Sequence, residues 1–234
     1  MASKPLSGIT IAVTRPREQG AQLAQRIEQA GGAVFLFPLL DIAAVQDTKT
    51  LHEQIARLAQ FDLAIFISPN AVRYGIAAIR DVGAQLVARL ERVDRAINCA
   101  PTISCASNEY GLPPNLKIAT GGQGSAKALR ELGIANVIAP AQRFDSEGLL
   151  SLPELQDVAG WRVMIFRGDG GRELLGDTLK ARGAAVEYAT CYRRSKPQQD
   201  VRVLLDAKPD AITVTSSEAM GYLRQMLGDS AQTL

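Results

Sequence analysis

Gly8-Ile9-Thr10-Ile11-Ala12-Val13 aligns with Gly160-Trp161-Arg162-Val163-Met164-Ile165 when the sequence is shifted by 152 positions. A second match, at a shift of 148 positions, aligns residues 62–71 with residues 210–219. Two long matches at nearly the same offset indicate an internal duplication. Because the period is far longer than the roughly 20–50 residues of a solenoid repeat, the duplicated unit has the size of a domain.

Each copy at the shift of 152 predicts a strand, a helix and a second strand, which together form a βαβ unit. The expected strands are apolar along their whole length, as is typical of a parallel sheet that is covered on both faces. The first copy has strands at 9–14 and 33–37 around a helix at 19–30, and the second has strands at 162–166 and 185–189 around a helix at 173–180.

The match at the shift of 148 adds one strand to each copy, at 63–68 and 211–216. Two further strands are expected at 116–119 and 137–139, with a helix at 125–132 between them. The sequence therefore predicts an α/β fold with two similar open parallel-sheet (flavodoxin-like) domains.

The order of these segments predicts that one domain is inserted in the other. The outer domain is expected at 1–37 and 196–234, and the inner domain at 47–188. The linkers, at 38–46 and 189–195, are expected to pair as a two-stranded antiparallel ladder. Under the repeat, the outer domain lacks counterparts of the last strands and helices of the inner one, so we expect a shortened outer sheet.

Composition excludes several classes of function. With 234 residues, 47% of them hydrophobic, and a net charge of +2, the chain has no basic field typical of a nucleic-acid-binding protein. No apolar run is long enough to span a membrane. Its three cysteines and single histidine, His52, lack metal-ligand spacing, so no metal is expected. These features predict a cytoplasmic protein.

Candidate ligand-binding residues follow the expected strands, because open α/β sheets bind ligands at the carboxyl ends of their strands. The loops concerned are 14–17, 68–70, 120–125, 167–172 and 215–217. The segment Arg167–Gly171 is glycine-rich but has neither a P-loop ending nor G-x-G-x-x-G spacing, so no nucleotide cofactor is expected. Each loop can be explained by helix capping alone. Together with Arg15, Arg17, Arg167 and Arg172, however, loops from both domains also suit an acidic ligand in a cleft.

Several stretches of the sequence, which include parts of these loops, resemble those of the uroporphyrinogen-III synthase family. The stretches that carry the resemblance lie at 11–16, 65–72, 146–155, 167–175, 182–184 and 191–194. The most specific is Arg167-Gly168-Asp169-Gly170-Gly171-Arg172-Glu173-Leu174-Leu175. Residues 80–114 carry no motif.

The resemblance implies that the chain cyclises hydroxymethylbilane, a linear tetrapyrrole with several carboxylates, to uroporphyrinogen III. In this reaction the last pyrrole ring is inverted and water is lost. It implies no cofactor, a monomer, and a transient encounter with hydroxymethylbilane synthase as the source of the substrate. Neither nucleic acid nor a membrane is an expected partner.

The resemblance also implies roles for individual residues. Tyr192 matches a tyrosine proposed to assist loss of the hydroxyl group, since a phenol with a pKa near 10 can donate a hydrogen bond to the leaving oxygen. Serine at 125 replaces the threonine of the family. The implied substrate-binding residues are Arg15, Ser68, Asn70, Gly122, Ser125, Arg167, Gly168, Arg172, Ser216 and Ser217.

Two other functions remain open from the sequence. A binding module of the same fold would hold a tetrapyrrole or another polycarboxylate without turnover, and the short outer domain favours it. A small-molecule sensor unrelated to porphyrins would leave the match at Arg167–Leu175 unexplained.

Overall fold

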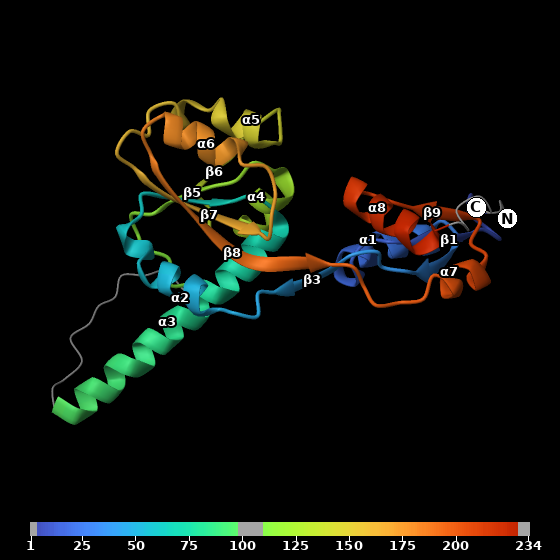
Figure 1. Cartoon of the computed structure of the whole chain (residues 1–234), viewed down its shortest axis with the longest axis horizontal. Coiled ribbons are helices and arrows are strands. Elements are labelled where there is room, and N and C mark those ends of the chain that lie inside the picture. The colour runs from blue at the N-terminus through green and yellow to red at the C-terminus, as the bar shows by residue number, and fades with distance from the viewer. Residues whose placement is uncertain (1–3, 98–109, 229–234) are drawn as a thin grey trace. The chain divides into compact units, whose positions relative to one another are not determined.

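The computed structural model describes residues 4–97 and 110–228. The chain forms two compact units, shown in Figure 1. Unit 1 contains residues 1–43 and 194–234, and unit 2 contains residues 44–193. Each unit is an α/β structure with a parallel sheet, which confirms the predicted fold class.

Unit 1 is built on a three-stranded parallel sheet with the order β2-β1-β9. Its elements are β1 (Thr10–Val13), α1 (Arg17–Gln29), β2 (Ala33–Leu36), α7 (Arg202–Ala207), β9 (Ala211–Thr213) and α8 (Ser217–Leu227). The core of the unit joins Ala12 of β1 and Phe37 to Leu204 of α7 and Leu223 of α8. The buried residues of α8, namely Ala219, Leu223 and Leu227, recur every four positions, so this helix presents one apolar face to the core.

Unit 2 is built on the longer sheet, whose order is β3-β8-β7-β4-β5-β6. Its strands are β4 (Leu63–Phe66), β5 (Lys117–Ala119), β6 (Val137–Ile138), β7 (Arg162–Gly168) and β8 (Ala185–Ser195), and the edge strand β3 (Asp41–Ala44) contains a boundary between the units. Its helices are α2 (Lys49–Ala56), α3 (Pro69–Ile97), α4 (Gln123–Glu131), α5 (Ser146–Leu150) and α6 (Leu174–Ala181), with short 3₁₀ turns at Leu58–Gln60 and Pro153–Leu155.

Alternate side chains of the central strands of unit 2 face opposite layers of helices. Ile65 and Ile165 join a cluster with Leu149 of α5 and with Leu175 of α6. The neighbouring rings of Phe66 and Phe166 stack 4.6 Å apart on the other face. A Cβ at Gly75 of α3 would lie about 3 Å from both rings, so the small residue lets this helix approach the sheet closely. Figure 1 shows α5 and α6 on one side of the sheet and α2 and α3 on the other.

The sheet register shows that the sequence repeat is a structural repeat. Thr10 pairs with Ala33 in unit 1, and the residues 152 positions later, Arg162 and Ala185, pair in unit 2. Likewise Ile11 pairs with Ala211, as Val163 pairs with Leu63. The order β2-β1-β9 therefore corresponds to β8-β7-β4, with every partner in the same register.

The repeat extends to the helix ends. The hydroxyl of Ser68 accepts a hydrogen bond of 3.1 Å from the backbone N–H of Ala71, at the start of α3. The hydroxyl of Ser216 accepts one of the same length from Ala219, at the start of α8. Both serines thus cap helices, as the capping interpretation of these loops predicted.

Two elements of unit 2 differ from the prediction. β8 runs without interruption from Ala185 to Ser195, so the expected strand at 185–189 and the expected linker strand at 189–195 are one strand. Helix α3 continues to Ile97 through a region for which the sequence offered no motif. Leu86 and Val87 of this helix are half exposed.

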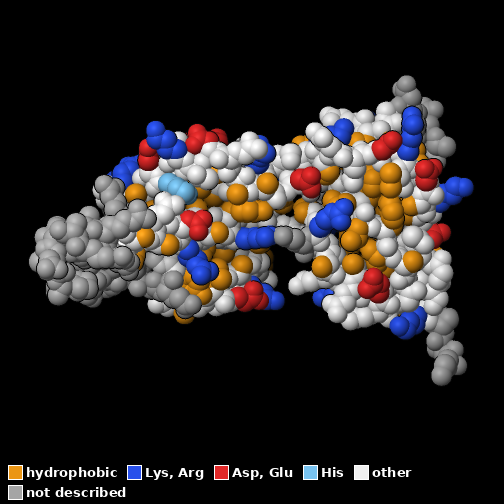
Figure 2. Space-filling view, turned by 90° about the horizontal axis from the view of Figure 1, so that it is seen from below, with side chains coloured by type: hydrophobic (Ala, Val, Ile, Leu, Met, Phe, Trp, Pro, Cys, Tyr) orange, Lys and Arg blue, Asp and Glu red, His pale blue; other side chains and the backbone are white. Residues whose placement is uncertain are grey.

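Figure 2 shows basic and acidic side chains interspersed over the face that it displays. His52, the only histidine, lies on the surface of unit 2. Within residues 4–97 and 110–228, no three His, Cys, Asp or Glu side chains gather in a way that could hold a metal ion. No helix of this described part is both long enough and apolar enough to cross a membrane.

Candidate functional site

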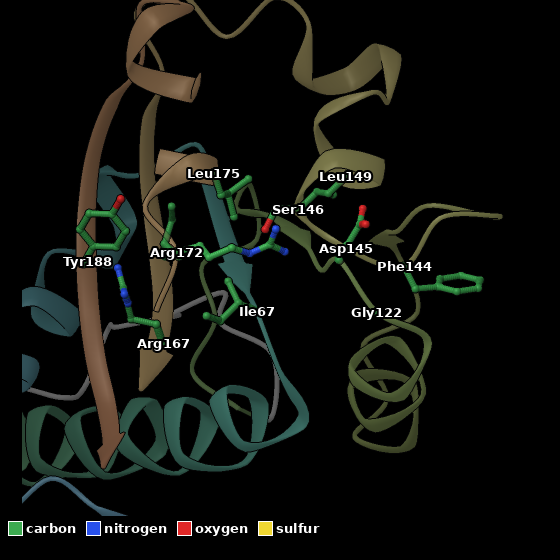
Figure 3. Close-up of a pocket in the computed structure, with 12 residues that line it drawn as sticks. Ile67, Gly122, Phe144, Asp145, Ser146, Leu149, Arg167, Arg172, Leu175 and Tyr188 are labelled. Atoms are coloured by element: carbon green, nitrogen blue, oxygen red, sulfur yellow. The ribbon is translucent and has the colours of Figure 1, made fainter. Parts of the chain in front are cut away.

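A cavity of about 290 Å³ opens in unit 2 where β4, β5 and β7 end. Because these strands are parallel, their carboxyl ends meet at one edge of the sheet, where open α/β folds bind ligands. The lining residues that Figure 3 labels are Ile67, Gly122, Phe144, Asp145, Ser146, Leu149, Arg167, Arg172, Leu175 and Tyr188. The lining of this cavity thus combines apolar side chains with two arginines and one carboxylate. We call the cavity the unit 2 pocket.

Arg167 is the buried cation of the unit 2 pocket. Its side chain is only 7% exposed, and its Nη1 atom lies 2.8 Å from Oε1 of Glu173. The guanidinium also lies 4.8 Å from the centre of the Tyr188 ring. Figure 3 shows the side chain directed toward that ring. A buried arginine needs such partners, since an unpaired charge in a protein interior is costly.

Glu173 and Tyr188 affect each other's protonation. The hydroxyl of Tyr188 and then the guanidinium of Arg167 lower the pKa of Glu173. Burial, followed by the nearby carboxylate of Glu173, raises the pKa of Tyr188 to about 12. No hydrogen bond of good geometry reaches the Tyr188 hydroxyl from the described residues. Near neutral pH, Glu173 is therefore a carboxylate and Tyr188 a neutral phenol.

Arg172 is the exposed cation of the same pocket. Its side chain is 64% exposed, and its Nη1 atom lies 3.0 Å from Oε1 of Glu147. Figure 3 shows it reaching across the pocket toward Ser146. The other carboxylate oxygen of Glu147 is buried without a hydrogen-bond partner among the described residues. Oε1 of Glu147 also lies 3.6 Å from Nη2 of Arg143, so this carboxylate keeps a cationic partner when another carboxylate binds Arg172.

Asp145 serves the local structure of the pocket wall. It precedes α5 and accepts a hydrogen bond of 2.7 Å from the backbone N–H of Gly148. The guanidinium of Arg143 donates a second one, also of 2.7 Å. The backbone N–H of Gly148 and then Arg143 hold the pKa of Asp145 below its ordinary value. This carboxylate therefore stays ionised and caps the helix.

Tyr192 lies inside unit 2 and is not one of the residues that line the pocket. Its side chain is fully buried, and its hydroxyl lies 3.0 Å from the hydroxyl of Ser68. The ring stacks on Tyr74 with centroids 5.9 Å apart. A Cβ at Gly168 would lie 2.6 Å from Cε2 of Tyr192, so glycine is required for this contact. The catalytic role of Tyr192 stays a prediction.

The structure brings only some of the predicted substrate-binding residues of unit 2 to the pocket. Gly122, Arg167 and Arg172 line it. Ser68 caps α3, Asn70 lies in the first turn of that helix, and Ser125 is buried in α4. Gly168 supports the ring of Tyr192. Substrate contacts of these four residues remain predictions.

Unit 1 holds the other predicted binding residues. Arg15 follows β1 at its carboxyl end, and Ser216 and Ser217 stand at the start of α8. The two serines line a shallow depression of about 500 Å³ together with Val214, Thr215 and Met220. In the repeat, Arg15 corresponds to Arg167 and Ser216 to Ser68, so both units place these residue types at equivalent strand ends.

Sequence reasoning missed the acidic and aromatic partners of the two pocket arginines. Glu147 and Glu173 stand within stretches that carried the family resemblance, yet nothing in their spacing indicated ion pairs with Arg172 and Arg167. Tyr188 is one residue of an ordinary apolar strand. Its contact with Arg167 depends on the pairing of β7 with β8, which a one-dimensional pattern does not reveal.

Comparisons of the sequence with a family model and with curated proteins indicate the same family. A family model described as uroporphyrinogen-III synthase HemD matches residues 21–234. Uroporphyrinogen-III synthase of Salmonella typhimurium is 34% identical over 192 residues, which cover 82% of this chain and 68% of the relative. The synthase of Escherichia coli is 37% identical over 186 residues, covering 80% and 65%. This chain therefore matches about two thirds of the length of each of these relatives.

The fold also has counterparts among solved structures. A mutant uroporphyrinogen III synthase from Thermus thermophilus superposes with a TM-score of 0.60 at 20% sequence identity. The match covers 96% of this chain and 79% of that one. At this identity the likeness concerns the fold, and it agrees with two α/β units built on parallel sheets.

Proposed function

This chain belongs to the uroporphyrinogen-III synthase family, and we propose that it cyclises hydroxymethylbilane to uroporphyrinogen III. The observation that carries the proposal is the match of the family model to residues 21–234, together with curated synthases at 34% and 37% identity. The reaction joins the two ends of the bilane, inverts the last pyrrole ring and releases water.

The unit 2 pocket supports a ligand that carries carboxylates. Arg167 and Arg172 supply two guanidinium groups, which bind carboxylates through paired N–H donors. Gly122 lies just before α4, where free backbone N–H groups favour an anion. Ile67 and Leu175 provide the apolar surface that a pyrrole ring requires. These features suit an acidic tetrapyrrole better than a neutral or cationic ligand.

In the proposed reaction the leaving hydroxyl group needs a proton donor, and the ring system that remains carries positive charge until the new bond forms. We assign the donor role to Tyr192, as the family resemblance implied. Its hydroxyl shares a hydrogen bond with Ser68 in this structure, so it would exchange that partner for the leaving oxygen. The pocket arginines bind the peripheral carboxylates and fix the orientation of the bilane.

The overall reaction is redox-neutral. The C–O bond of the hydroxymethyl group, one C–H bond of the last ring and the C–C bond from that ring to its neighbour break, while two C–C bonds form in the inverted, closed ring system. Water carries away the hydroxyl group and the proton. The proposal includes no cofactor and no metal, as the family resemblance implied. It also includes a cytoplasmic location, a monomer and a transient encounter with hydroxymethylbilane synthase. Nucleic acid is not part of the proposal, because a net charge of +2 provides no strong basic field.

The experiment that tests the proposed function is the isomer composition of the product. Hydroxymethylbilane is generated in place, the purified chain is added, and the uroporphyrins are oxidised and separated. The expected result is a clear excess of the type III isomer over a reaction without the chain, in which closure occurs without inversion. Type I product alone, from a chain shown by circular dichroism to be folded, would refute the proposal and favour a binding module.

A further inference from the structure

Two arginines line the same pocket, but only one is fixed in place. Arg167 has a side chain that is 7% exposed, whereas that of Arg172 is 64% exposed. We infer that Glu173 and Tyr188 are positioning residues that fix the guanidinium of Arg167 at the pocket wall, where it binds a carboxylate of the tetrapyrrole. The inference rests on the proposed function for the identity of the ligand, and on the contacts of Arg167 for the roles of its partners.

The partners hold Arg167 in two different ways. Glu173, just before α6, pairs with Nη1 at 2.8 Å and so fixes one edge of the guanidinium. Tyr188, on β8, presents its ring 4.8 Å from the guanidinium carbon and so fixes one face. An edge contact and a face contact together leave the planar group little freedom to rotate. No other hydrogen bond from this guanidinium to the described residues is present, so its remaining N–H donors can bind a ligand in the pocket.

Two glycines make room for this arrangement. Gly171 has φ of +124°, and a Cβ there would lie 3.1 Å from Nη2 of Arg167. Gly176 lies inside α6, where a Cβ would collide with the hydroxyl of Tyr188. Glycine is a poor residue for a helix interior, so its presence at 176 is explained by the space that the phenol requires.

The protonation states of the two partners suit the same role. Burial, and then the carboxylate of Glu173, raise the pKa of Tyr188 to about 12, so the phenol keeps its proton. The Tyr188 hydroxyl and then Arg167 lower the pKa of Glu173, so the ion pair persists to mildly acidic pH. The pair keeps its charges throughout the neutral range.

Glu147 provides a matched comparison within the same pocket. Its carboxylate pairs with Arg172 at 3.0 Å and also with Arg143 at 3.6 Å, whereas Glu173 pairs with Arg167 at 2.8 Å. Glu147→Gln and Glu173→Gln each remove one negative charge from the surroundings of one pocket arginine. By charge alone, both changes would strengthen the binding of a polyanion. A positioning role for Glu173 predicts the opposite sign for that variant.

The test measures the binding of uroporphyrin I, a stable tetrapyrrole that carries carboxylates on all four rings, by fluorescence titration of the full chain. We expect Glu173→Gln to raise the dissociation constant at least tenfold, and Glu147→Gln to lower it or leave it within twofold. Steady-state turnover of hydroxymethylbilane should show the same contrast in KM, with little change in kcat. Equal effects of the two variants would overturn the inference.

Variants of Tyr188 test the face contact separately. Tyr188→Leu removes the aromatic ring and should weaken binding at least tenfold, while Tyr188→Phe keeps the ring and should restore most of the affinity. The Nε proton of Arg167, observed through its ¹⁵N correlation, should exchange slowly with water in the wild type. Its exchange should become faster in Glu173→Gln. Tyr188→Leu binding as tightly as the wild type, in a chain with an unchanged melting curve, would contradict the role of the ring.

These outcomes separate the inference from the proposed function. A wild-type chain that binds uroporphyrin I but forms no type III isomer would refute the synthase activity and leave the positioning roles to be judged by the variants. A wild-type chain that does not bind uroporphyrin I at all would refute the inference, whatever its activity.

Discussion

The surroundings of Tyr188 in the pocket raise the pKa of its hydroxyl, which a titration can measure. Its ring contacts Arg167, and its hydroxyl is buried against α6 and close to Glu173. The environment favours the neutral phenol, because ionisation would place a second negative charge beside a carboxylate in a partly dry site. An acid whose pKa is raised in the folded state stabilises the fold below its ordinary pKa and loses this effect as pH rises.

An alkaline titration should show this shift. Tyr188, whose pKa is raised to about 12, should ionise late in the titration, above the ordinary tyrosine pKa of about 10. Its contribution to stability is present below pH of about 10, the ordinary value, and is lost between about 10 and 12. The phenolate absorbance of the wild type and of Tyr188→Phe, followed as the pH is raised, measures the ionisation of Tyr188. A late component that persists in the variant would contradict the assignment.

Tyr192 carries the catalytic prediction at the same scale. Replacing it with phenylalanine removes the donor proposed for the leaving hydroxyl group and should lower kcat about 10²-fold. The lost hydrogen bond to Ser68 should cost only about 1 kcal/mol of stability, so the fold persists. Turnover and thermal unfolding of the variant check the two parts. Unchanged kcat would remove Tyr192 from the mechanism.

At the scale of elements, the repeat made most of the fold predictable. A shift of 152 positions placed β1 and β2 on β7 and β8, and the apolar strands indicated parallel sheets. Element ends were less predictable, since β4 and β9 stop at Phe66 and Thr213, before the serine loops. The length of α3 could not be predicted either, because the sequence between 80 and 97 has no proline and no capping signal to mark an end.

Helix capping in unit 1 gives a prediction with an internal control. Ser216 caps α8 through the backbone N–H of Ala219, whereas Ser217 is the first residue of the helix and does not make this bond. Ser216→Ala should destabilise unit 1 by about 1 kcal/mol, and Ser217→Ala by much less. Chemical denaturation of both variants measures the difference. Equal losses would show that the capping bond is not the cause.

At the scale of the whole molecule, two copies of one α/β unit each bring a serine-capped helix and an arginine to corresponding strand ends. The sequence identified three residues of the unit 2 pocket, Gly122, Arg167 and Arg172, because glycine and arginine next to a strand end have a recognisable pattern. It did not identify Glu147, Glu173 or Tyr188. Their roles arise from contacts between separate elements, which only the folded chain brings together.

The most direct test is the share of type III uroporphyrin formed from hydroxymethylbilane by the wild type and by Arg167→Leu, measured side by side. The wild type should give mainly the type III isomer. The variant should approach the type I product of spontaneous closure, because the bilane loses its fixed carboxylate partner in unit 2. Type I product from a folded wild-type chain would contradict the synthase function, and full type III formation by the variant would contradict the proposed site.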